Sequence, residues 1–295
     1  MGSARQPGPV CYHLAYTLVV SDVDSASRWP RGASSKTKTA TRLVRHRIHM
    51  FDIFHLSLAA CMFLGAALYS SVGHGGASAY IALMALFSVA PTVMRPTALA
   101  LNIFVAALGS YRYAHAGYFR WRVVWPFLLG SLPFAFIGGG IQLPGNYYRV
   151  IVGVVLILSG LRMFFAAHIY AKREVHDPPI WLSILIGVGL GLLSGLTGTG
   201  GGIFLSPIII FLSWSDLRTT SGIAAMFILG NSIAGLMGNV AIVRSLPAEL
   251  PLYIVAVVAG GLLGTTFGTK FPIVYVRRAL GVVLLVAGVK LIGVY

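Results

Sequence analysis

The chain has 295 residues, of which 57% are apolar and only 10% are charged, and its mean hydropathy is +0.83. A solvated surface cannot cover a chain of this composition, which excludes an ordinary soluble protein and indicates a polytopic integral membrane protein. The net charge is +15, yet 8 of the 22 basic residues precede Met50 and most others flank apolar segments; this pattern reports membrane topology and argues against a nucleic-acid partner.

Residues 1–49 are basic, contain many Ser, Thr and Gly residues, and hold only one short apolar run, Val10–Val20. We expect a disordered tail. Two alternatives are a secretory signal peptide, which the acidic Asp22 and Asp24 after the run disfavour, and a translation start at Met50.

From residue 53 onward the chain contains ten apolar segments: 53–72, 77–90, 97–116, 123–142, 148–170, 180–197, 203–214, 219–242, 251–269 and 273–293. Most approach or reach the roughly 20 residues that a helix needs to cross a bilayer. The segments 77–90 and 203–214 are too short, and each follows a run of glycines. The sequence therefore predicts an all-α fold with two interrupted membrane segments.

The stronger interruption lies at Gly198–Gly202, in the uncharged stretch Gly187–Pro207. Glycine costs roughly 0.5–1 kcal/mol relative to alanine inside a helix, so this run predicts a helix end. Within hydrocarbon, broken backbone persists only where it is buried in protein or lines a wet cavity. The break therefore predicts a cavity or binding site.

The chain from Phe51 onward repeats itself. Gly73-His74-Gly75-Gly76 corresponds to Gly198-Thr199-Gly200-Gly201, and Asn102 corresponds to Asn231. The stretch from Arg149 to Arg162 matches the stretch from Arg277 to Lys290 in its glycines and basic residues. We expect two homologous membrane repeats, 50–170 and 180–295, joined by a polar linker at 171–179.

Each repeat is expected to contain a broken or re-entrant pair of segments and three longer transmembrane helices. If each pair enters and leaves the membrane on one side, the repeats are inverted relative to each other. The positive-inside bias favours this arrangement. It places Arg120, Arg122, Lys172, Arg173, Arg218, Lys270, Arg277 and Arg278 inside, and Arg95, Arg149 and Arg244 outside.

Two broken segments at matching positions are the best sequence pointer to the substrate site of a transporter. Half-helices that begin near Ala77 and Ile203 would direct N–H groups and a positive dipole end at an anion. The candidate substrate-binding residues are Gly73, His74, Gly75, Gly76, Ser78, Asn102, Thr197, Gly198, Thr199, Gly200, Gly201, Gly202 and Asn231. The alternative is structural: close helix packing for the glycines, a backbone hydrogen bond for His74, and interhelical hydrogen bonds for the asparagines.

Other chemistry is poorly supported. Cys11 and Cys61 suggest neither a disulfide framework nor a metal site, and the acidic residues after residue 50 lie at segment ends or in linkers. We see no buried carboxylate relay and no catalytic constellation, so we expect a protein that is not an enzyme and that uses no cofactor. No strand precedes the glycine run, which excludes a dinucleotide fingerprint.

Several residues at segment ends have simpler interpretations. Arg112 is expected to extend its side chain to the membrane interface, with substrate gating as the alternative. The aromatic residues at segment ends are expected to be interfacial. These are Trp121, Trp125, Tyr147 and Tyr148.

The motifs resemble those of the sulfite exporter TauE/SafE family of membrane permeases, over about 54–291. Gly191–Pro207 is similar to the signature of its second repeat, Val72–Met84 to that of its first, and Phe227–Gly235 to the segment that follows the second. The first repeat departs from the second in having Ala77 where the second has Gly202, and in lacking an equivalent of Pro207. The resemblance implies a duplicated helical transporter for small anions such as sulfite or sulfonates in a bacterial inner membrane.

We therefore expect a permease whose partners are a small anionic substrate and the lipid bilayer. An anion channel, or a membrane scaffold or assembly factor that transports nothing, are the alternatives.

Overall fold

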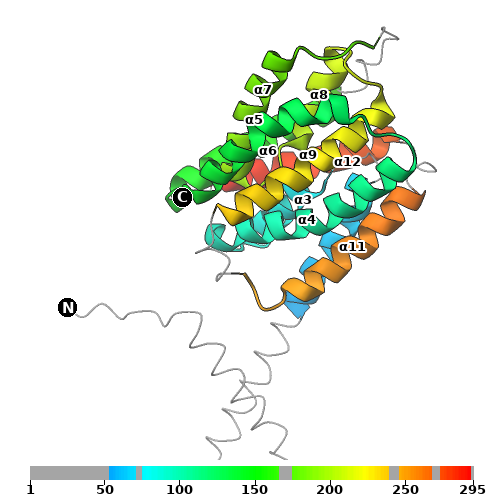
Figure 1. The fold of residues 1–295 in the computed structure, drawn as a ribbon. Helices are drawn as coiled ribbons and strands as arrows, with labels where there is room; N and C mark the ends of the chain where they lie inside the picture. The colour runs from blue at the N-terminus through cyan, green and yellow to red at the C-terminus, as the bar shows by residue number, and fades with distance from the viewer. Residues whose placement is uncertain (1–52, 71–74, 166–174, 239–245, 268–272, 294–295) are drawn as a thin grey trace, which may run out of the picture. The chain divides into compact units, whose positions relative to one another are not determined.

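The computed structural model describes residues 53–70, 75–165, 175–238, 246–267 and 273–293, and within these ranges it contains ten helices and no strand (Figure 1). They are Ile53–Ser70, α3 (Ala77–Leu86), α4 (Pro91–His115), α5 (Trp121–Gly140), α6 (Gly145–Phe165), α7 (Ile180–Thr197), α8 (Gly202–Phe211), α9 (Leu217–Met237), α11 (Leu250–Phe267) and α12 (Ile273–Gly293). Each predicted apolar segment corresponds to one helix, so the all-α prediction is confirmed. The predicted tail at 1–49 and Gly73 and His74 lie outside the described residues.

Six of these helices are long and apolar enough to cross a membrane: Ile53–Ser70, α4, α5, α6, α7 and α9. The two half-helices α3 and α8 have ten residues each. At 1.5 Å per residue, each spans about 15 Å, half of a bilayer core. The protein is a multi-pass membrane protein.

The start of α4 differs from the prediction. The helix begins at Pro91, because proline is favoured in the first turn, where its missing N–H removes no helical hydrogen bond. Only four residues therefore connect α3 to α4, and Arg95 lies inside the helix with 6% of its surface exposed. Arg95, which precedes the predicted apolar segment 97–116, therefore lies in the first turns of the helix and is buried.

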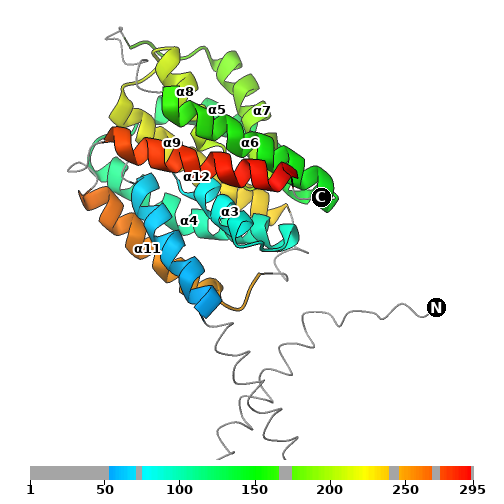
Figure 2. The ribbon, with the colours of Figure 1, turned by 180° about the vertical axis from the view of Figure 1, so that it is seen from behind.

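Residues 55–295 form one compact unit, in which the helix directions follow from the contacts. Helix α7 runs parallel to α5, since Gly187 adjoins Phe127 and Gly195 adjoins Ala135. Likewise Ile53–Ser70 runs parallel to α11, because Phe63 adjoins Gly260 and Ala67 adjoins Gly264. Both pairs lie side by side in the ribbon (Figures 1 and 2).

Helices at corresponding positions of the two predicted repeats are antiparallel. In α6 and α12, a Cβ atom on Gly153 would lie 2.9 Å from the carbonyl oxygen of Gly288, and one on Gly160 would lie 2.9 Å from that of Gly281. In α4 and α9, Asn102 bonds Ser232 while Gly109 adjoins Ala225. In each pair of helices, contacts at higher residue numbers in the first helix involve lower residue numbers in the second, so the two helices run in opposite directions.

We name the two ends of the helical unit after an arginine found at each. At the Arg149 end, α4 and α6 begin, and α3 and α12 end, since residues from all four helix ends line one pocket there. At the Arg120 end, α5 begins beside the linker that leads into α7, since the Arg120 guanidinium lies 2.7 Å from the Asp177 carboxylate. The backbone N–H of His176 in this linker also donates to the carbonyl of Ser213, just after α8.

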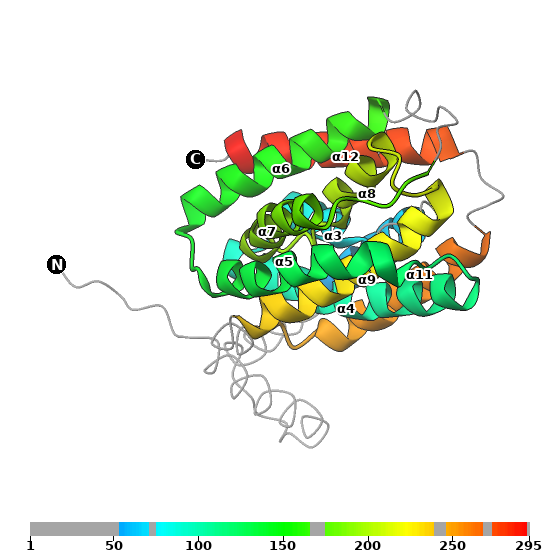
Figure 3. The same cartoon turned by 45° about the horizontal axis from the view of Figure 1, so that its top comes forward.

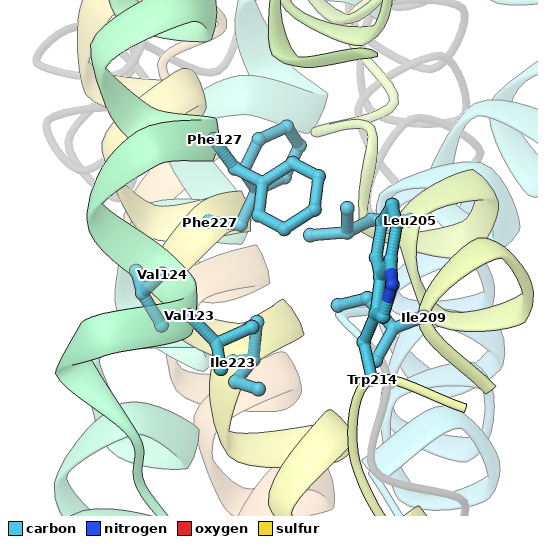
Figure 4. Packing of buried hydrophobic residues seen from close by; sticks show 8 residues of the cluster. All are labelled: Val123, Val124, Phe127, Leu205, Ile209, Trp214, Ile223 and Phe227. Carbon is cyan, nitrogen blue, oxygen red and sulfur yellow. The ribbon is translucent and has the colours of Figure 1, made fainter. Parts of the chain in front are cut away.

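The half-helices α3 and α8 lie between the α6–α12 pair and the group formed by α4, α5, α9 and α11 (Figure 3). Leu205 and Ile209 of α8 pack against the α5 and α9 side chains of a buried cluster that also contains Trp214 (Figure 4). The other members are Val123, Val124, Phe127, Ile223 and Phe227. This packing holds α8 against the long helices and fixes the position of its N-terminus.

The half-helices end in the same way. The backbone N–H of Val89 donates to the carbonyl of Met84, and that of Trp214 donates to the carbonyl of Ile209, in the 6→1 pattern of a Schellman motif. In both motifs a serine occupies the left-handed position that usually holds glycine, Ser88 with φ 58° and Ser213 with φ 57°. These are the positive-φ residues other than glycine in the described chain.

Candidate functional site

The second break is a sharp reversal between α7 and α8. Its backbone takes left-handed φ angles of 83° at Gly198, 75° at Gly200 and 72° at Gly201. Residues with a Cβ atom adopt these angles at a cost of about 1–2 kcal/mol each, so the glycines permit the reversal. The N–H of Gly198 donates to the carbonyl of Ser194 and closes α7, and Gly201 is the N-cap of α8.

The two breaks meet at one place, beside Asn102 of α4 and Ile228 of α9. A Cβ atom on Gly75 would lie 3.3 Å from Asn102 Oδ1 and 3.0 Å from Ile228 Cδ1. One on Gly200 would lie 2.5 Å from Asn102 Nδ2 and 2.9 Å from Ile228 Cγ2. Both side chains lie near the middle of their helices, so the meeting point lies about halfway along α4 and α9.

Neither half-helix has a side-chain cap at its N-terminus. The first N–H groups of a helix have no acceptor within the helix, and the helix dipole adds about half a positive charge at this end. The start of α3 and the start of α8 therefore present hydrogen-bond donors and positive potential beside the same two residues.

Several buried polar atoms of the half-helix region and of α4, α7 and α9 have no hydrogen-bond partner in the described chain. Asn231 is fully buried, and neither atom of its amide has a partner. The same holds for Asn102 Oδ1, for the Ser194 hydroxyl beside Gly201, and for the Tyr80 hydroxyl beside Gly76. An unsatisfied buried polar group costs about 1–3 kcal/mol, so a hydrogen-bond partner for any of these atoms would stabilise the protein.

The hydroxyls predicted at the breaks already have partners within the protein. Ser78 donates to the Tyr69 hydroxyl over 2.8 Å. Thr197 Oγ1 lies 2.7 Å from the carbonyl of Leu193 and 2.9 Å from Thr199 Oγ1. These hydrogen bonds stabilise the backbone at the two breaks. They also reduce the capacity of Ser78, Thr197 and Thr199 to bind a ligand directly.

Sequence reasoning missed the two tyrosines at the first break. Tyr69 lies in the last turn of the helix before the break, Tyr80 lies one turn into α3, and both are fully buried. The available signal was Tyr80 itself, the one aromatic residue of the half-helix and, with Ser78, one of its two hydroxyls.

Arg95 was also missed, and it lies against the second break. A Cβ atom on Gly198 would lie 3.2 Å from Arg95 Cγ. Its guanidinium, however, donates to the carbonyls of Gly138, Gly139 and Ile141 at the end of α5. Because these bonds compensate carbonyls at a helix C-terminus, Arg95 is chiefly a structural cation.

One interpretation of a residue at a helix end is corrected. Tyr148 was expected at the interface, but it is buried and its hydroxyl donates to the carbonyl of Thr197 over 3.1 Å, which ties α6 to the second break. Trp121 and Tyr147 are exposed, as expected. Arg112 donates to the hydroxyls of Thr265 and Thr266 and so joins the ends of α4 and α11.

A cavity of about 20 Å³ leads from Gly75 toward the Arg120 end. Its walls include Ser70, Tyr113 and Thr265, and it has room for about one water molecule. Among the described residues, no group of three or more His, Cys, Asp or Glu side chains could hold a metal ion.

Comparisons with known proteins agree with this architecture. The model of the family described as Sulfite exporter TauE/SafE matches residues 58–291. The probable membrane transporter protein y4hK of Sinorhizobium fredii is 37% identical over 245 residues, which cover 82% of this chain and 99% of the relative. The probable membrane transporter protein YdhB of Bacillus subtilis is 23% identical over 242 residues, covering 78% of this chain and 97% of the relative.

A shorter match joins the chain to the probable membrane transporter protein MJ0441 of Methanocaldococcus jannaschii. The two are 27% identical over 154 residues, which cover 48% of this chain and 57% of the relative. No solved structure matches the chain significantly. The family match spans most of the helical unit, and with the relatives named as membrane transporters it shows that the chain belongs to the sulfite exporter TauE/SafE family.

Proposed function

We propose that the protein is a permease that moves a small anion, such as sulfite, a sulfonate or a related organosulfur compound, across the inner membrane. The substrate would bind where the two glycine-rich breaks meet. The observation that carries this proposal is the pair of uncapped half-helix N-termini beside Asn102 and Ile228, among buried polar atoms that lack partners. Helix N-termini suit anions because they offer both N–H donors and positive potential.

Recognition would rely on neutral donors and helix ends. The amide of Asn231 and the hydroxyl of Tyr80 have no partner in the described chain, whereas the guanidinium of Arg95 already bonds three carbonyls. A site without a full charge releases its anion more readily than one built on a buried arginine. His74 and Gly73 are proposed members of this site from their place in the sequence.

The helix directions support two inverted repeats. Ile53–Ser70 runs from the Arg149 end toward the Arg120 end, and α3 returns to the Arg149 end. The linker leads into α7 at the Arg120 end, and α8 returns there. In each repeat, the helix before the break and the half-helix after it enter and leave the membrane on the same side. That side is opposite in the two repeats, which is the inverted arrangement found in many secondary transporters.

The decisive experiment is substrate flux in proteoliposomes that contain the purified protein, with sulfite, sulfate, thiosulfate and small sulfonates as test solutes. A permease should show saturable uptake of at least one of these anions and counterflow when unlabelled anion is trapped inside. Saturable flux without counterflow would favour a channel. Absence of flux for every solute would favour a scaffold or assembly factor.

A further inference from the structure

The cavity beside Gly75 follows α4 from the first break to the Arg120 end, where α9 and α11 form its other walls. Val105, Gly109 and Tyr113 line it from α4, and each lies about one helical turn beyond the previous one. Thr265 lines it near the end of α11. The cavity therefore extends from the middle of α4 to the last turn of that helix.

In this conformation the cavity is too narrow for an anion. Its volume of about 20 Å³ holds about one water molecule, whereas sulfite already has several heavy atoms. Its walls nonetheless suit a small anion, because Ser70, Tyr113 and Thr265 carry hydroxyls and none of the described residues that line it is acidic. An anion can pass along this line only if α11 moves away from α4.

Arg112 joins the two helices at the Arg120 end of the cavity. Its guanidinium donates to the Thr265 hydroxyl, to the Thr266 hydroxyl over 3.1 Å and to the carbonyl of Leu262 over 3.3 Å. Thr265 is therefore both an acceptor for Arg112 and a wall of the cavity. Because Tyr113 lines the cavity from α4 next to Arg112, the separation of α4 and α11 determines the width of the cavity at this end.

Helix α11 packs more closely on Ile53–Ser70 than on α4. A Cβ atom on Gly264 would overlap the carbonyl oxygen of Ala67, so the backbones of these two helices are in contact. A Cβ atom on Gly261 would lie 3.6 Å from the side chain of Val105 on α4, an ordinary van der Waals distance. The two parallel helices can therefore move together against α4, and the hydrogen bonds at the end of α11 oppose that movement.

We propose that the transported anion passes between α4 and α11 at the Arg120 end, and that the hydrogen bonds of Arg112 to α11 hold this path closed. The inference rests on the proposed permease function. The acceptors are neutral and the bonds to Thr266 and Leu262 are exposed, so water can replace them when the helices separate. Hydrogen bonds from a charged donor shift an equilibrium by roughly ten- to 150-fold, which is enough to keep the path mostly closed and still allow it to open.

Cysteine accessibility tests the path without measuring transport. In protein without Cys11 and Cys61, Ala106→Cys places a thiol in the cavity wall, where the native side chain is 2% exposed. The protein in nanodiscs is treated with sulfonatoethyl methanethiosulfonate, a thiol reagent that itself carries a sulfonate, and labelling is followed by mass spectrometry. Labelling should be at least about tenfold faster with Arg112→Gln. Thr265→Val removes an acceptor and keeps the side-chain shape, so it should act in the same direction and serves if the arginine variant does not fold.

Two controls distinguish an opened path from a loosened protein. Arg122→Gln removes an exposed charge at the same end and should leave the labelling of Ala106→Cys unchanged. Ala287→Cys places a thiol at a fully buried position of α12, outside the cavity, and should not be labelled in the Arg112→Gln protein. Faster labelling at both cysteines would indicate general loosening and would overturn the proposal.

Flux in proteoliposomes is measured on the same variants. Arg112→Gln should raise the maximal flux by about threefold or more and leave apparent affinity within about twofold, because the bonds stabilise the closed path and lie away from the central site. If this variant transports at the parental rate and Ala106→Cys is labelled no faster, the path is wrong and the permease function stands. Absence of flux for every anion would overturn the permease function, and the path with it.

Discussion

The side chain of Asn102 lies so close to Gly200 that a Cβ atom on the glycine would be 2.5 Å from the amide nitrogen Nδ2. The two residues are 98 positions apart in the chain. Asn102 also adjoins Gly75 through its oxygen Oδ1, so this one amide joins the break of the first half to the break of the second.

Replacing Gly200 by leucine should reduce flux to background while the protein is still inserted. The side chain would meet Asn102 and Ile228, and the φ of 75° adds strain of about 1–2 kcal/mol. Gly189→Leu on α7 is the matched control, because no atom lies within 4 Å of a Cβ atom there. Proteoliposome flux and membrane yield are measured together; full flux in well-expressed Gly200→Leu would contradict the site assignment.

Replacing Asn231 by leucine should leave thermal stability unchanged or raised and lower the flux by at least about tenfold. Removing a buried amide without partners relieves desolvation in the empty protein, whereas the substrate loses a donor. Ser131→Ala removes another unpartnered buried hydroxyl, on α5, and should alter neither quantity. A fall in stability without a change in flux would indicate that Asn231 has only a packing role.

Replacing Tyr80 by phenylalanine should weaken apparent substrate affinity by about 2- to 13-fold, as expected for loss of one neutral hydrogen bond of about 0.5–1.5 kcal/mol. The volume of the side chain is retained, so the packing of α3 should not change. Tyr111→Phe is the control, because it removes the same hydroxyl group from a tyrosine on α4 that is 62% exposed. Equal affinities in both variants would exclude the Tyr80 hydroxyl from the site.

Loops at the Arg120 end should be cytoplasmic. Arg120, Arg122 and Arg218 gather there, and Lys172–Arg173 and Arg277–Arg278 are predicted to join them under the positive-inside bias. In a variant without Cys11 and Cys61, a cysteine at Arg122 should resist an impermeant thiol reagent in intact cells, whereas one at Tyr147 should react. The reverse labelling would overturn this orientation.

Replacing His74 by glutamine should lower transport moderately and flatten its dependence on pH between about 5 and 8, where an unperturbed histidine titrates. Arg112→Gln should mostly spare anion binding, because Arg112 bonds Thr265 and Thr266 at the end of α11. Binding and flux are measured across this pH range. Loss of binding in Arg112→Gln together with an unchanged pH profile in His74→Gln would reverse the two assignments.

The sequence by itself determined the helices, the breaks and the family. Apolar length sets a membrane helix and a glycine run ends one, and both are local properties of the chain. The predicted segments at 180–197 and 203–214 therefore agree with α7 and α8 within a few residues. The boundary at 97 was wrong because the favourable first turn at Pro91 outweighed the charge of Arg95, which the α5 carbonyls compensate.

Only the tertiary structure decided which residues meet. The place of Asn102 between the two breaks, the burial of Tyr148 under Thr197 and the pairing of Arg95 with the end of α5 depend on how antiparallel helices cross. Arg149 and Lys290 are 141 positions apart, and they share a pocket because the start of α6 lies beside the end of α12. Periodicity along one helix describes which residues share its face, but it does not specify the partner helix, because small residues allow close packing against many different surfaces.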